Sequence, residues 1–254
     1  MFKLVLSEKE IKKVRTFCAH GFFGARINTT LAAYGTDDRF VRTWYEENNN
    51  HITAVAQLTQ AAAVVQCTPD ADFDSLAVLL QFAGAKTVTG EKECMEKLGL
   101  PQAGRGYLMT AEAVVSAQTK AEKTDSELLA LLYPVLFGET ARKENPTDFA
   151  VWYADLSHRV RHGLCECFAV FEEKEAVSCA SVLYSNAQYG CIGAVATRPE
   201  HRRRGFGSAC TLTAAQSVLA NGQTPCLACA DGGIHKWYES MGFAVSGEWA
   251  EASI

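Results

Sequence analysis

The chain has 254 residues, of which 48% are apolar and 21% charged, and its formal net charge is -5 at pH 7. This length suits one large domain or two of ordinary size, and we expect two. The acidic total disfavours a general nucleic-acid-binding protein, and no apolar run approaches the roughly 20 residues of a membrane span. Because no signal-peptide core follows Met1, we predict a soluble, cytoplasmic protein without nucleic-acid or membrane partners.

The first hundred residues are predicted to be mixed α and β structure. In chain order, we expect helix, helix, strand, strand, helix and helix over residues 8–19, 22–33, 52–57, 61–67, 73–84 and 91–98. Residues 101–106 have the Pro and Gly content of a linker. We therefore place a domain boundary there, with one unit over 1–103 and a second over 104–254.

The second unit has a clearer pattern. In chain order, we expect strand, helix, a hairpin of two strands, strand, helix, strand, helix and strand over residues 107–110, 125–136, 165–171, 176–184, 189–197, 206–221, 225–230, 233–241 and 243–250. Antiparallel strands followed by a β-α-β-α-β run predict an α/β (α+β) fold, in which helices flank a mixed, twisted sheet.

The ten cysteines lie mostly in apolar runs, which is typical of reduced and buried thiols. Cys226 and Cys229 have the spacing of a metal half-site, but no second such pair accompanies them in the sequence. We therefore predict structural cysteines and no metal site.

Residues 195–209 carry the most informative pattern. A strand ends there, a short turn holds arginines and two glycines, and a helix starts at once. The free N–H groups of a first helical turn and the helix dipole both favour an anion. Gly205 and Gly207 let the backbone approach a phosphate closely, and the arginines can add charge-assisted hydrogen bonds. The segment therefore predicts a phosphate-binding turn.

Arg202-Arg203-Arg204-Gly205-Phe206-Gly207 resembles the signature of the GNAT superfamily of N-acetyltransferases, which is Arg or Gln, two residues, Gly, one residue, and Gly or Ala. Tyr238-Glu239-Ser240-Met241-Gly242-Phe243 resembles the family's Tyr-x-x-x-Gly-Phe at the expected distance. Seven residues before the tyrosine the family usually has Asn, where this chain has Asp231. The resemblance covers about residues 106–254 and is to the two-domain bacterial type.

The resemblance implies an acetyl-CoA-dependent transfer to an amine of a small molecule or a protein. A strand-like backbone would pair with the pantetheine arm, the turn would hold the pyrophosphate, and Tyr238 would protonate the departing thiolate. A phenol pKa of about 10 is close enough to a thiol pKa of about 8.5 for this role. The implied cofactor-binding residues are Val195, Ala196, Thr197, Arg202, Arg203, Arg204, Gly205, Phe206, Gly207, Ser208 and Asp231.

The acceptor side is expected around residues 152–163, a run that in the family shapes the acceptor pocket. The candidate substrate-binding residues are Tyr153, Asp155, His158, Arg159 and His162. No Asp, Glu or His occurs over residues 189–197, so a histidine of this group, its aspartate or a water relay is the expected base. The alternative is an ordered loop with a buried Asp–Arg pair.

The first unit has the same loose element order and suggests a degenerate copy of the fold, with an unrelated α/β domain as the alternative. Asp70, Asp72 and Asp74 lie where a phosphate turn would fall, and they would repel a pyrophosphate. We expect this unit to serve packing, homodimerisation or one wall of the acceptor site.

Three functions are open at this point. An N-acetyltransferase is the first, and a non-catalytic acyl-CoA-binding or sensing protein is the second, because the strand before the glycine turn lacks a base. A nucleic-acid-binding module built on residues 198–204 is the third, and the acidic total and the absence of a recognition motif disfavour it.

Overall fold

The computed structural model describes residues 1–37 and 40–254. The first half of the chain forms β1 (Phe2–Leu4), α1 (Glu8–Phe17), η1 (Cys18–His20), α2 (Phe22–Tyr34), β2 (Arg42–Asn48), β3 (His51–Thr59), β4 (Ala62–Cys67), α3 (Phe73–Phe82), β5 (Thr87–Glu91), α4 (Lys92–Lys97) and β6 (Gln102–Thr110). The second half forms β7 (Glu122–Thr124), η2 (Leu129–Leu131), α5 (Leu132–Phe137), α6 (Ala141–Glu144), α7 (Pro146–Arg161), β8 (Glu166–Glu172), β9 (Glu175–Ser185), β10 (Tyr189–Thr197), η3 (Pro199–His201), α8 (Phe206–Ala220), β11 (Thr224–Ala230), α9 (Ile234–Glu239) and β12 (Ala244–Ser253).

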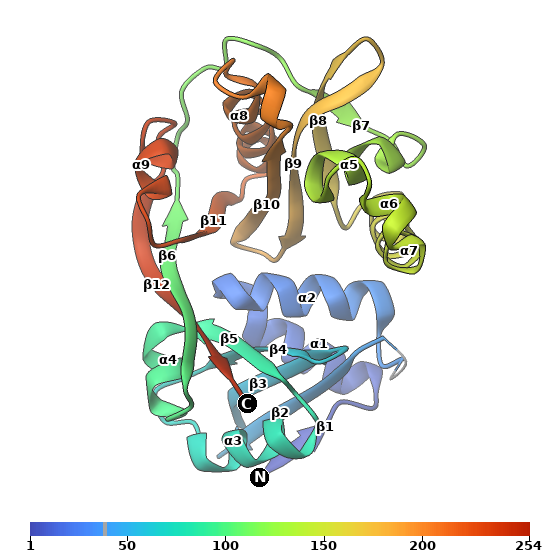
Figure 1. Cartoon of the computed structure of the whole chain (residues 1–254). Coiled ribbons are helices and arrows are strands. Elements are labelled where there is room, and N and C mark those ends of the chain that lie inside the picture. Colours follow the sequence, from blue (N-terminus) through green and yellow to red (C-terminus); the bar gives the residue numbers. More distant parts are fainter. Residues whose placement is uncertain (38–39) are drawn as a thin grey trace.

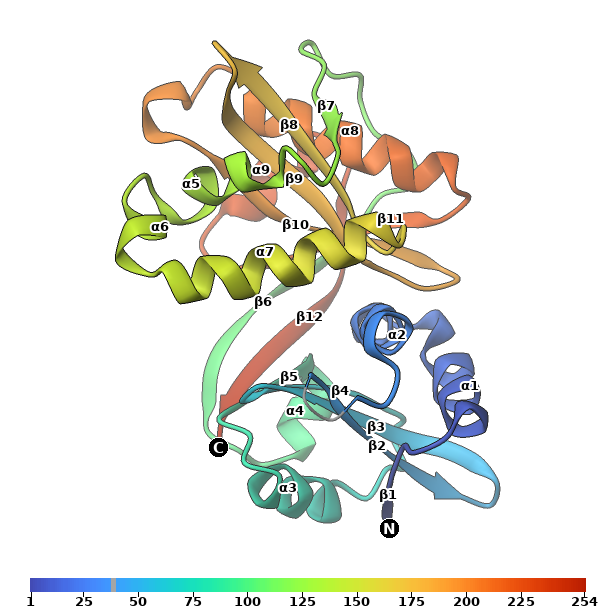
Figure 2. The ribbon, with the colours of Figure 1, turned by 90° about the vertical axis from the view of Figure 1, so that its right-hand side faces the viewer.

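All these strands join one mixed, twisted sheet with helices on its faces (Figures 1 and 2). The strand order is β1-β2-β3-β4-β5-β12-β6-β11-β10-β9-β8-β7, which reads the same from both ends once β1 to β6 are matched to β7 to β12. The β4–β5 and β10–β11 pairs are both parallel. The predicted mixed α/β fold, with a copy in the first half, is therefore confirmed. The expectation of two sheets, one for each predicted unit, is wrong, because the strands of both halves join in one sheet.

The two halves exchange their last strands. β6 pairs with β11 of the second half, β12 pairs with β5 of the first half, and the two exchanged strands pair with each other. Each carries core residues across: Met109 joins the core around α8, while Ala250 and Ala252 join the core around α3. The halves are thus held together by main-chain hydrogen bonds and by shared cores.

The linker predicted over residues 101–106 is wrong, because all of it after Pro101 belongs to β6. A Cβ on Gly106 would lie 2.0 Å from the Cys229 carbonyl oxygen and 2.7 Å from the Trp249 Nε1. The glycine therefore serves close strand packing rather than chain flexibility. The division at residue 103 stays a prediction.

The helix predicted over residues 125–136 is also largely wrong. The Asp125 carboxylate accepts hydrogen bonds from the Glu127 and Leu128 N–H groups at 3.0 and 3.2 Å, which holds a turn there. Pro134 cannot donate to a carbonyl one turn back, so a helix can include it only in its first turn. Only η2 and the short α5 form in this stretch.

Of the described residues, no helix is long and apolar enough to cross a membrane. The ten cysteines are all free, nine of them are buried, and the described part of the chain contains no cluster of metal ligands.

Candidate active site

Strand β10 leaves its neighbour β11 partway along its length. The two strands pair from Tyr189 only as far as Ile192, whereas β10 continues beside β9 to Thr197. A bulge between Gly193 and Ala196 accompanies this departure, and Ala194 within it has a φ of 51°. In the described pairing, the main chain of residues 195–197 therefore has no strand partner on the side of β11, and an added extended chain could pair there.

The turn after β10 ends in a helix start with free donors. Gly205 has a φ of 82°, which favours glycine, and the first intrahelical bond runs from the Ala209 N–H to the Gly205 carbonyl at 2.9 Å. The N–H groups of residues 206–208 thus lack an intrahelical acceptor. A Cβ on Gly207 would lie 3.1 Å from the Thr197 Oγ1. The predicted phosphate-binding turn has the local geometry that an anion needs.

The arginines of this turn have different surroundings. Arg204 forms an ion pair with Glu172, and its hydrogen bonds, together with its charge, lower the pKa of that carboxyl. Arg202 donates from Nε to the Thr197 carbonyl at 3.2 Å. Arg202 and the exposed Arg203 have no carboxylate partner among the described residues, so they are the cations best suited to an incoming anion.

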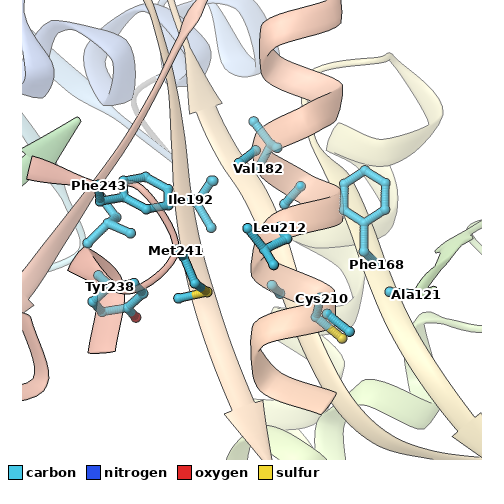
Figure 3. Packing of buried hydrophobic residues seen from close by; sticks show 14 of the residues in the cluster. Ala121, Phe168, Val182, Ile192, Cys210, Leu212, Tyr238, Met241 and Phe243 are labelled. Atoms are coloured by element: carbon cyan, nitrogen blue, oxygen red, sulfur yellow. The ribbon is translucent and has the colours of Figure 1, made fainter. Parts of the chain in front are cut away.

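Tyr238 lies on α9 and is 7% exposed. Its ring packs beside Trp237 and Phe243, and Figure 3 shows its oxygen on the side of the ring away from Phe243. Burial raises the pKa of Tyr238 to about 12. The phenol is therefore fully protonated at neutral pH and can donate a proton. Asp231, a predicted cofactor-binding residue, is exposed just after β11.

Four of the five predicted acceptor residues lie on helix α7, not on a loop, and His162 follows its last residue. Arg159 donates from Nη2 to Asp155 at 2.6 Å, so the Asp–Arg pair weighed as the alternative is present. Tyr34 of the first half donates to the same carboxylate. The His158 Nε2 lies 3.1 Å from the Ala33 carbonyl oxygen, also in the first half. These side chains hold the two halves of the molecule together.

The other two candidates, Tyr153 and His162, also have partners. The Tyr153 hydroxyl donates to the Ser126 carbonyl at 3.2 Å, and the ring of the exposed His162 lies tilted against that of His158 with 4.3 Å between centroids. Helix α7 packs on the core cluster that includes Ala196, whereas Tyr238 belongs to the cluster around α8. In Figure 2, α7 and α8 lie on opposite faces of the sheet. The structure thus places Tyr238 in the core cluster of α8, and α7 on the other face of the sheet, where its cluster includes Ala196.

A groove of about 640 Å³ lies elsewhere, beside α3 in the first half. Its lining includes Phe2, Asp72, Asp74 and Phe82. We do not assign the active site to it, because its carboxylates would repel a phosphate and it contains none of the features described above.

Solved structures share this arrangement, in which two copies of one fold form a single chain. The structure is similar over 100% of this chain and 98% of that chain to a tandem GNAT protein from the clavulanic acid biosynthesis pathway, with 13% identity and a TM-score of 0.63. It is also similar to a GNAT-family acetyltransferase from Colwellia psychrerythraea, with 9% identity and a TM-score of 0.63 over 100% of this chain and 99% of that chain. A GCN5-related N-acetyltransferase from Kribbella flavida is similar with 14% identity and a TM-score of 0.62 over 92% of this chain and 96% of that chain.

In the second half, residues 170–251 match the model of the FR47-like protein family. No curated protein matches the chain. The matched range contains the bulge of β10, the phosphate turn and Tyr238, and the predicted resemblance to the two-domain GNAT type is confirmed.

Proposed function

We propose that this chain is an acetyl-CoA-dependent N-acetyltransferase that moves an acetyl group to the primary amine of a small molecule or a protein. The observation that carries the proposal is the departure of β10 from β11 after Ile192, next to a helix start with free N–H groups. An extended amide-bearing arm suits the open strand edge, and a pyrophosphate suits the helix start. CoA combines both chemical features.

The residues of the second half would divide the work as follows. The main chain of residues 195–197 would pair with the pantetheine arm, and the N–H groups of residues 203–208 would hold the pyrophosphate. Arg202 and Arg203 would add positive charge. When bound, acetyl-CoA supplies the activated acetyl group. This assignment fits a turn in which Gly207 leaves room that a side chain would fill.

Tyr238 would act as the general acid toward the leaving sulfur. Burial raises the pKa of Tyr238 to about 12, which makes it a weaker acid than a free phenol. The same loss of water raises the pKa of a thiol bound beside it, because desolvation disfavours every anion. The two acids therefore stay close in strength, and proton transfer to the departing thiolate remains feasible.

A second candidate is a protein that binds or senses acyl-CoA without turning it over. It is favoured by the absence of Asp, Glu and His on β10. It is also favoured because the candidate bases Asp155 and His158 both contact the first half. In that case the strand edge and the phosphate turn would bind acyl-CoA, and no group would accept the amine proton.

Thiol release from acetyl-CoA, followed across a panel of spermidine, lysine, glucosamine and tyramine, separates the two candidates. An acetyltransferase releases thiol and yields an acetylated amine that mass spectrometry detects. Acetyl-CoA binding without release over a wider amine panel would instead establish the sensing function. If acetyl-CoA does not bind at all, both candidates are wrong.

A further inference from the structure

Trp237 connects the helix that carries Tyr238 to the start of α8. Its indole Nε1 donates to the Ser208 Oγ at 3.2 Å. The edge of its ring borders the helix start, because a Cβ on Gly207 would lie 3.5 Å from the Trp237 Cζ2. Its ring also contacts the ring of Tyr238, with 4.7 Å between centroids. One side chain thus touches both the phosphate turn and the predicted acid.

The hydrogen bond to Ser208 fixes the role of the serine hydroxyl. An indole N–H can only donate, so the Ser208 oxygen accepts from Trp237 and its own proton must point elsewhere. No acceptor for that proton is present among the described residues. Ser208 is the third residue of α8, beside the N–H groups that lack an intrahelical acceptor. The serine hydroxyl is therefore still free to donate, close to these amides.

Helix α9 depends on such an anchor. It has only six residues and follows Gly232 and Gly233, which have φ values of 132° and 92°. A helix this short has little stability of its own, and two glycines before it allow many entry angles. The Trp237–Ser208 bond and the surrounding apolar packing fix its position relative to α8.

We propose that Trp237 is a positioning residue that sets Tyr238 relative to the phosphate turn, so that a cofactor held at α8 has its sulfur at the tyrosine hydroxyl. This inference rests on the proposed acetyltransferase function. A displacement of about 1 Å between a catalytic group and its target can cost up to 10²-fold in rate. The loss of one anchoring hydrogen bond should therefore lower turnover more than cofactor affinity.

The test uses the full chain at saturating acetyl-CoA, with turnover read as kcat on an amine that the wild-type protein acetylates. Trp237→Phe keeps a ring and removes the N–H, and Ser208→Ala removes the same bond from its other side. Each should lower kcat about tenfold, and the double variant should lose no more than one of them. The acetyl-CoA affinity of Trp237→Phe should change less than threefold.

The decisive arm places Trp237→Phe in a Tyr238→Phe background. If Trp237 acts through Tyr238, its substitution there should change kcat less than twofold, because the group that it positions is gone. Trp249→Phe is the matched control, since it removes an indole N–H bond to the Cys229 carbonyl at 3.0 Å. It should lower the melting temperature and leave kcat unchanged.

The positioning role alone is overturned if folded Trp237→Phe and Ser208→Ala keep the wild-type kcat. It is also overturned if Trp237→Phe costs the same factor with and without the Tyr238 hydroxyl. If the wild-type protein releases no thiol with any amine, the proposed function and this role are both wrong, which is a different result from either of the first two.

Discussion

The two halves of this chain have the same element order, yet the start of α8 in the second half has no side-chain cap and the start of the corresponding helix α3 in the first half has one. The difference is clearest at one position of the sheet. Strands β2 and β8 both have a register shift, after Glu46 in the first and after Val170 in the second. Val170 is buried among apolar side chains. Glu46 is 5% exposed, and its Oε2 accepts hydrogen bonds from the Asp72 N–H at 3.0 Å and the Thr53 hydroxyl at 2.7 Å.

In the first half, a carboxylate of the chain itself therefore lies at the start of α3, where the second half keeps free N–H groups at the start of α8. The Asp72 side chain adds a second carboxylate at this helix start, which accepts from the Ser75 N–H at 3.0 Å. A helix start favours one anion, and here side chains supply it. The comparison shows how the same fold can fill this position with its own carboxylates and keep its shape.

Two further differences agree with this. β3 and β4 pair without interruption from Ala54 to Thr59, whereas β9 and β10 shift register at the bulge. Gly99 and Gly242 both have positive φ at the end of corresponding helices. Four residues before them stand Met95 and Tyr238, so the first half has a thioether where the second has a hydroxyl.

Of the differences expected between the two halves, the largest is the loss of turnover in Tyr238→Phe. This substitution should lower turnover by about 10²-fold or more and change acetyl-CoA affinity little, because only the proton donor is lost. Tyr45→Phe removes the hydroxyl of an equally buried tyrosine in the first half and should leave turnover unchanged. Steady-state kinetics and calorimetry check both, and wild-type turnover in Tyr238→Phe would leave Tyr238 a core residue.

Much of this second half could be predicted from the sequence. The helix expected over residues 206–221 and the hairpin joined at Glu172 to Glu175 form nearly as expected, because glycine stops and alternating apolar residues are local signals. The phosphate turn is equally local, since strand end, glycines and helix start are neighbours in the chain. The joining of both halves in one continuous sheet could not be predicted from local signals, because pairing between β5 and β12 joins residues more than 150 positions apart.

The first half was harder to predict because its sequence signals and its contacts disagree. Strand β2 reads Arg-Thr-Trp-Tyr-Glu-Glu-Asn and was not expected, since its charges mask the alternation of buried residues. Glu46 is buried there because two donors from distant parts of the fold satisfy it. Likewise, nothing local to residues 152–163 shows that Asp155 would meet Tyr34 across the joint between the halves.

The next effect concerns stability at high pH. Burial raises the pKa of Tyr238 from 10.0 to about 12, so between these values the folded protein keeps a proton that the unfolded chain releases. Stability from this group is complete below about pH 10 and is lost as the pH rises toward 12, by roughly 2 kcal/mol. Denaturant unfolding of the wild type and of Tyr238→Phe at pH 8 and 11 should show about 1.4 kcal/mol of this loss in the wild type alone, and equal losses in both would contradict the burial.

A smaller effect is expected from Gly205→Val, which should weaken acetyl-CoA binding at least about tenfold because the turn can no longer hold its φ of 82°. Gly84→Val is a matched control in the first half. Gly84 has a φ of 81°, and as at Gly205 a Cβ would meet nothing within 4 Å. Both variants should lose similar stability in unfolding experiments, and only the first should lose affinity in calorimetry. Equal affinities would place the cofactor elsewhere.

The smallest effect is expected from Glu46→Gln. The amide keeps the shape of the side chain but weakens its hydrogen bonds to Asp72 and Thr53, so the free energy of unfolding should fall by about 1 kcal/mol. Turnover should not change, and no second cofactor site should appear, because Asp70, Asp72 and Asp74 remain. A gain of acetyl-CoA stoichiometry would show that Glu46 alone excludes the phosphate.

The central claim is that acetyl-CoA binds this chain at the second half and nowhere else, and its most direct test is calorimetric titration of the full chain with acetyl-CoA. The account predicts one site per chain, weakened at least about tenfold by Gly205→Val and unaffected by Gly84→Val. Two equivalent sites per chain, or one site indifferent to Gly205→Val, would contradict it.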